Sequence, residues 1–372
     1  MRYVSLPADH DRDTELPGQT HGRPPVDDVT RRASAAPRGH LAVLDGWRGI
    51  SILCVLAGHM LPLGPSVFGG NVAVAATGMA LFFTLSGFLI TTTLLRDDAV
   101  VPFIIKRLFR ILPLAWLYVV VVIGGMGAPW SVVVPNLLFY ANASEATLAY
   151  APHFWSLSLE MQFYAFVAVL VAIGGRRALW LLPLLAVTVT GNRAAHHVMF
   201  GVHTLDRIDE IMAGATLALA LHRGWRAPAW AARPWVIAAM VAILMLGMTA
   251  PVIAHFPYVC YVRPYMAALV VGLSLGLDHS RLARLLRGRV LGYIARISYA
   301  LYVLHPLSYA GWMGSGDVVV RYTKRIGSFM LAFGGAHLST FYFEQPLTRL
   351  GHRIAQGVKR REPTPSESII TA

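Results

Sequence analysis

Charged and titratable side chains interrupt an apolar segment, LDGWRGISILCVLAGHM, that begins at Leu44. Arg48 and His59 are eleven residues apart, so on an α-helix they lie on nearly the same face, roughly 16 Å apart along the axis. Asp45 lies one turn before Arg48. The segment therefore carries a stripe with charge at one end and an imidazole at the other. Either Asp45 and Arg48 mark the polar start of a membrane span, or the stripe is functional.

Two further clusters follow in the next apolar segments. In Ser86–Phe88 the central glycine would let a second backbone or a ligand approach closely. Arg107 and Arg110 are three residues apart, so they share a helix face and could hold a phosphate group between them. The alternative is that these arginines only anchor a span at the cytoplasmic surface.

Glu160 lies inside another apolar segment, on one helix face with Ser156 and Tyr164. A carboxylate in such a position is costly unless it meets a cation or a proton. Glu160 could form a structural ion pair with Arg48, or it could orient His59 as the carboxylate of a catalytic triad does.

The segment ISYALYVLHPL places Tyr302 and His305 on one helix face, followed by Pro306, which would kink the helix. Tyr302 and His305 are either a hydrogen-bonded pair between helices or part of a binding site.

The composition indicates what must position these side chains. Of the 372 residues, 56% are hydrophobic and only 14% are charged, whereas a soluble domain has about 25% charged residues. The sequence therefore predicts an all-α, polytopic membrane protein. Its net charge of +13 does not indicate a nucleic-acid partner, because the basic residues lie between apolar segments and not on one surface.

Ten apolar segments predict a bundle of about ten membrane spans with both termini in the cytoplasm. They are 44–63, 72–95, 106–126, 154–173, 178–191, 208–222, 234–254, 262–277, 291–312 and 326–343. Counting Arg48 at the start of the first span, 25 of the 32 lysines and arginines would then be cytoplasmic. Six would lie in outer loops, namely Arg193, Arg207, Arg263, Arg321, Lys324 and Arg325.

Polar tails are expected on both sides of this bundle. Residues 1–40 and 351–372 are predicted to be disordered cytoplasmic tails, and 41–350 to be the membrane domain. We expect the domain to lie in a bacterial plasma membrane, in contact with lipid.

Two other classes of membrane protein compete at this point. Acidic residues and histidines inside a bundle also suit a proton-coupled transporter or flippase, but the sequence has no internal repeat to support an inverted-repeat transporter. A purely structural subunit would not explain four polar clusters. A metal site lacks support, because His196, His197 and His203 follow no H-E-x-x-H pattern.

The four clusters, in this order, resemble the acyltransferase-3 family of integral membrane O-acyltransferases over residues 41–350. Five elements match, namely Arg-x10-His, Ser-Gly-Phe, Arg-x-x-Arg, WSLxxE and SYxLYxxHP. The matching residues are Arg48 and His59, Ser86–Phe88, Arg107 and Arg110, Glu160, and Tyr302 and His305. One position departs from the family, which often has a second glutamate where this chain has Met161.

The resemblance implies an O-acyltransferase that binds no cofactor and uses acyl-CoA as its co-substrate. It would move an acetyl or short acyl group to a hydroxyl of an antibiotic, glycolipid or saccharide. It implies His59 as the general base, with Glu160 or Asp45 orienting the imidazole. A covalent acyl-histidine route would use the same His59.

The resemblance also implies a set of substrate-binding residues. They are Arg48, Arg107 and Arg110 for the phosphates of CoA, and Ser86, Tyr302 and His305, with His305 also suited to donate to an oxyanion.

Overall fold

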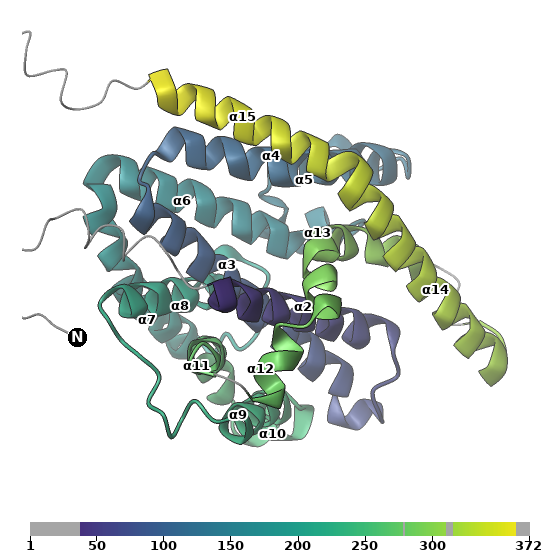
Figure 1. Ribbon diagram of the computed structural model, residues 1–372. Coiled ribbons are helices and arrows are strands. Elements are labelled where there is room, and N and C mark those ends of the chain that lie inside the picture. Colours follow the sequence, from purple (N-terminus) through teal and green to yellow (C-terminus); the bar gives the residue numbers. More distant parts are fainter. Residues whose placement is uncertain (1–37, 278–279, 310–314, 362–372) are drawn as a thin grey trace, which may run out of the picture. The chain divides into compact units, whose positions relative to one another are not determined.

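A computed structural model describes residues 38–277, 280–309 and 315–361, and over these ranges the chain is built of helices and short turns (Figure 1). The predicted all-α fold class is thereby confirmed for the described part of the chain. The prediction of a disordered tail for residues 1–37 and 362–372 lies outside the described residues.

A helix coincides with each of the ten expected apolar segments. These helices are α2 (Arg38–Met60), α3 (Gly70–Arg96), α4 (Val100–Tyr118), α6 (Phe154–Ala178), α7 (Leu182–Ala195), α8 (Thr204–His222), α9 (Pro234–Gly247), α11 (Val259–Ser274), α13 (Arg289–Tyr309) and α14 (Val318–Leu338). The shorter helices α5 (Trp130–Leu137), α10 (Ala250–His255) and α12 (Arg281–Leu286) connect them. Four helical stretches in the described ranges have the length and apolar composition to cross a bilayer, namely Ser66–Arg96, Val100–Gly124, Phe154–Ala195 and Arg289–Tyr309.

The C-terminal part differs from the prediction, because residues 351–361 continue a helix, α15 (Gln345–Arg361), instead of forming a disordered tail. Its sequence is mostly polar, and small residues form its buried face. Gly351 and Ala355, four residues apart, are both buried. Figure 1 shows α15, in yellow, lying along α4. A π-helical segment, Ser339–Glu344, joins α14 to α15.

Helices α3 and α8 cross at very short range because each has a glycine at the crossing. A methyl group added at Gly87 would lie 1.8 Å from the carbonyl oxygen of Ile211, and one at Gly214 would lie 1.9 Å from that of Thr84. The close approach predicted for Ser86–Phe88 is therefore confirmed, and the approaching group is the backbone of α8. The same crossing fixes the position of Ser86.

Replacing Gly87 with alanine should destabilise this crossing. The new methyl group would overlap a backbone oxygen that cannot move without displacing α8, so we expect a loss of about 3 kcal/mol in the free energy of unfolding. Gly292→Ala in α13 is the matched control, because nothing lies within 4 Å of a methyl group added there. Thermal unfolding of the detergent-purified variants measures both changes. Equal stability of the two variants would contradict the close packing of α3 against α8 at Gly87.

Candidate functional site

A small cavity of about 40 Å³ lies between α2, α3, α4, α6 and α13. Three guanidinium groups line it, that of Arg48 from α2 and those of Arg107 and Arg110 from α4. Ser86 of α3 and Glu160 of α6 also line it. The structure thus brings together five of the predicted site residues from four helices. We call this the arginine cavity.

The arginine cavity holds more positive than negative charge. Its one carboxylate, that of Glu160, accepts hydrogen bonds from the hydroxyls of Ser86 and Tyr164. Among the described residues, the ion pairs include none of the three cavity arginines. Arg107 instead lies over the ring of Tyr164, at 5.7 Å from the ring centroid. Three cations facing a single anion favour a ligand with several negative charges.

A pair of stacked histidines lies toward the other ends of α2 and α13. Nδ1 of His59 lies 3.2 Å from Nε2 of His305, and the ring centroids are 5.2 Å apart. His59 is exposed in the last turn of α2, whereas His305 is buried. The two residues are 246 positions apart in the sequence, so the fold alone pairs them.

The hydrogen bonds of this pair fix which ring nitrogens carry protons. Nδ1 of His305 lies 2.8 Å from the carbonyl oxygen of Tyr302, and because a carbonyl only accepts, this nitrogen must donate. In the neutral ring Nε2 of His305 then accepts, and Nδ1 of His59 donates to it. Nε2 of His59 is left with a free lone pair, which is what a general base needs.

Tyr302 and His305 have their polar atoms already engaged. The hydroxyl of Tyr302 donates to the carbonyl oxygen of His153 at 2.6 Å and also contacts Ser156. Both ring nitrogens of His305 have partners, so neither is free to donate to an oxyanion. His305 therefore does not have the free donor expected for an oxyanion. Its Nε2 instead contacts the ring of His59.

Neither predicted carboxylate is brought to His59. In the described part of the chain, the hydrogen bonds of Glu160 go to Ser86 and Tyr164, inside the arginine cavity. Asp45 is exposed near the start of α2, fourteen residues before His59, which is about 21 Å along one helix. The orienting group expected from Glu160 or Asp45 is replaced in the structure by His305.

The arginine cavity and the histidine pair are connected by two shared helices, α2 and α13. On α2, Arg48 lies at the cavity and His59 at the pair. On α13, Ser298 lines the cavity and His305 belongs to the pair. Just before α6, the ring of His153 lies 5.8 Å from that of His305, whereas Glu160 within α6 lines the cavity. Sequence reasoning missed His153, which lies two residues before the WSLxxE element and has no charge pattern around it.

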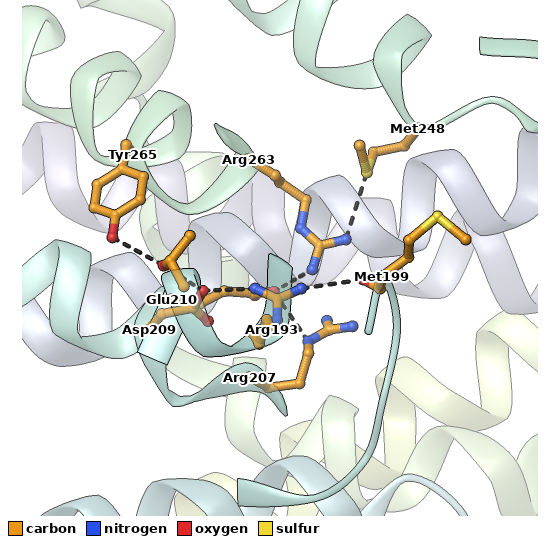
Figure 2. A network of polar contacts seen from close by, with 9 residues as sticks. Arg193, Met199, Arg207, Asp209, Glu210, Met248, Arg263 and Tyr265 are labelled. Atoms are coloured by element: carbon orange, nitrogen blue, oxygen red, sulfur yellow. Dashed lines mark hydrogen bonds and ion pairs between the residues drawn. The ribbon is translucent and has the colours of Figure 1, made fainter. Parts of the chain in front are cut away.

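A separate cluster of buried charges joins α7, α8 and α11 (Figure 2). Arg193 contacts Asp209 at 2.5 Å, and Glu210 pairs with both Arg207, at 2.9 Å, and Arg263. These five side chains are at most 6% exposed. The prediction that these three arginines lie in loops is therefore wrong, because they belong to α7, α8 and α11 and pair with carboxylates on α8. The available signal in the sequence was the run TLDRIDEIM, which has four charged residues at the start of an apolar segment.

Comparison with known proteins gives a family match and two relatives. A family model described as an acyltransferase domain matches residues 41–343. The chain is 25% identical over 375 residues to "Nodulation protein 10" of Rhizobium leguminosarum bv. viciae, covering 85% of this chain and 95% of the relative. It is 26% identical over 303 residues to "Putative membrane-bound transacylase BcsY" of Komagataeibacter xylinus, covering 72% and 73%. No solved structure matches.

Replacing Glu210 with glutamine should strongly destabilise the protein. The change leaves Arg207 and Arg263 buried without their counter-charge, so we expect a loss of about 3–5 kcal/mol in the free energy of unfolding. Asp98→Asn is the control, because it breaks an exposed ion pair with Arg176 and should cost less than about 1 kcal/mol. Thermal unfolding in detergent distinguishes them. A Glu210→Gln variant as stable as the control would show that the cluster does not hold the helices together.

Proposed function

We propose that this chain, which belongs to the acyltransferase-3 family of membrane acyltransferases, transfers an acetyl or other short acyl group from acyl-CoA to a hydroxyl group of an acceptor. Membership follows from the family match over residues 41–343. The observation that carries the finer proposal is the pairing, on shared helices, of a cavity rich in arginine with a histidine whose Nε2 is free.

We further propose that the ten helices at the expected segments span a bacterial plasma membrane, with both termini in the cytoplasm. The revised charge distribution supports this orientation. Of the six basic residues expected outside, Arg193, Arg207 and Arg263 are ion-paired inside the protein, and 25 of the 32 lysines and arginines fall on the cytoplasmic side. In this orientation the arginine cavity lies toward the cytoplasm, where acyl-CoA is available, and His59 lies toward the opposite side.

The arginine cavity suits the phosphates of CoA. Guanidinium groups bind phosphate oxygens through two parallel hydrogen bonds, and Arg107 and Arg110 share one face of α4. For its thioester to reach His59, a donor held there would have to place its pantetheine arm along the face of α2, where Ile52 and Val55 are packed in the core. The distance along this helix is roughly 16 Å, which an extended arm can bridge. The thioester would then reach the histidine pair.

The histidine pair supplies the proton transfer that the reaction requires. Nε2 of His59 takes the proton of the acceptor hydroxyl as its oxygen attacks the thioester carbonyl. The tetrahedral intermediate collapses, the carbon–sulfur bond breaks, and the leaving thiolate of CoA takes the proton back from His59. While His59 is charged, its hydrogen bond to His305 is charge-assisted and therefore stronger, which stabilises the imidazolium.

The acceptor would approach His59 from the exposed end of α2. Hydroxyls of an antibiotic, a glycolipid or a saccharide meet the chemical requirement, since the base removes a proton from any of them. The relative BcsY is described as a membrane-bound transacylase, which agrees with acyl transfer at a membrane.

Replacing His59 with alanine should abolish acyl transfer while the protein still folds. We expect a fall in rate of about 100-fold or more, because the general base is lost. The control variant is His255→Ala, because His255 is also an exposed histidine but lies in α10. This variant should keep full activity. The assay follows labelled acyl groups from acetyl-, propionyl- and isovaleryl-CoA into pooled lipid and antibiotic acceptors. Equal label in both variants would overturn the mechanism.

A further inference from the structure

A second cavity, of about 210 Å³, lies beside the arginine cavity and shares Arg107 and Arg110 with it. One wall comes from the end of α3 and from α4, including Lys106. The other wall comes from α15, through Thr348 and His352, which are four residues apart on one face of the helix. His352, which the sequence places in a disordered tail, thus lines a cavity next to the proposed donor site.

Two contacts hold α15 in this position. Near the cavity, Gly351 packs closely on Phe109 of α4. A methyl group added at Gly351 would lie only 2.4 Å from the Cβ of Phe109. Farther along, Nζ of Lys359 lies 2.5 Å from Oδ2 of Asp97, in the turn between α3 and α4. The hydrogen bond from Lys359 lowers the pKa of Asp97, so this carboxylate is ionised and already paired at neutral pH.

The second cavity therefore presents cations to whatever enters it. Lys106, Arg107 and Arg110 line it, and its one carboxylate, Asp97, is bound by Lys359. Partial burial lowers the pKa of His352, and the positive charges of Lys106, Arg110 and Arg107 lower it further. The ring of His352 is thus neutral when the cavity is empty and can accept a proton when an anion cancels the repulsion.

We propose that α15 forms one wall of the donor site, and that Lys106 and His352 bind the 3′-phosphate of the acyl-CoA donor. The proposal rests on acyl-CoA being the donor of the proposed function. In this arrangement the pyrophosphate occupies Arg107 and Arg110, which both cavities share, and the adenosine end of the donor extends under α15. A compact lysine ammonium and a protonated imidazole suit a phosphate monoester that projects from the arginine site.

The test compares the binding of CoA with that of 3′-dephospho-CoA, which lacks only this phosphate, by calorimetry on the full-length protein in nanodiscs. The unmodified protein should prefer CoA. In the variant with both Lys106→Gln and His352→Gln, the affinity for CoA should fall about tenfold or more, because two charged contacts are lost. Its affinity for dephospho-CoA should stay within about twofold, which also shows that the variant is folded.

Arg353→Gln is the matched control, because Arg353 is exposed on α15 and is not among the residues that line the cavity. It should keep the preference for CoA. The same preference in the double variant would overturn the inference and leave the proposed function intact. A protein that binds neither ligand would instead contradict acyl-CoA as donor, and both proposals would fall.

The pH dependence provides a readout specific to His352. Charged groups around its ring are Lys106, Arg107 and Arg110 on α4, and Asp97 with its partner Lys359. Because these cations lower the pKa of the free ring, a bound phosphate dianion should raise it, and binding should take up a proton. When the pH falls from about 7.5 to about 6.5, the affinity of the unmodified protein for CoA should therefore rise. The rise should be smaller in the His352→Gln variant. Identical pH profiles would contradict phosphate binding by this ring.

Anionic lipid is another source of phosphate near a basic helix. The binding comparison is therefore made in nanodiscs of phosphatidylcholine and of phosphatidylglycerol. Preference for CoA in both lipids supports a site for the donor. A preference that vanishes in phosphatidylglycerol would show that lipid head groups occupy Lys106 and His352, and it would overturn the inference.

Discussion

An excess of positive charge, held inside an apolar helix bundle, is the constraint on which the rest of the site depends. A buried cation is costly unless an anion lies beside it. The protein meets this cost in two ways. Arg193 and Arg263 are paired with carboxylates of α8 and are inaccessible. Arg107 and Arg110 are half-buried and face a cavity whose one carboxylate is bonded to neutral hydroxyls, so a bound anion would supply their counter-charge.

Contacts within one helix could be predicted from the sequence, whereas contacts between helices could not. The spacing of Glu160 and Tyr164 predicts that they share a face, and they are indeed hydrogen-bonded. Nothing in the sequence predicts that His59 meets His305, because helix periodicity says nothing about which helices pack together. Periodicity could have found α15, because Leu347, Leu350, Ile354 and Val358 recur at helical spacing between polar residues.

The proposed separation of anion binding from proton transfer also has a physical basis. A histidine close to several arginines would be held neutral and would be a weak base, because the imidazolium would be repelled. Placing His59 three helical turns from Arg48 removes this repulsion. His305 then supplies a neutral acceptor for Nδ1 of His59, which fixes the tautomer without adding a charge to an apolar environment.

Equilibrium binding of CoA to three forms of the protein tests this separation most directly. The forms are the unmodified chain, His59→Ala, and the double variant Arg107→Gln with Arg110→Gln. If the arginine cavity binds the donor and His59 acts only in the chemical step, His59→Ala should bind CoA as tightly as the unmodified chain. The double variant should bind it at least about tenfold more weakly. Weakened binding in His59→Ala with unchanged binding in the double variant would contradict the assignment of the two sites.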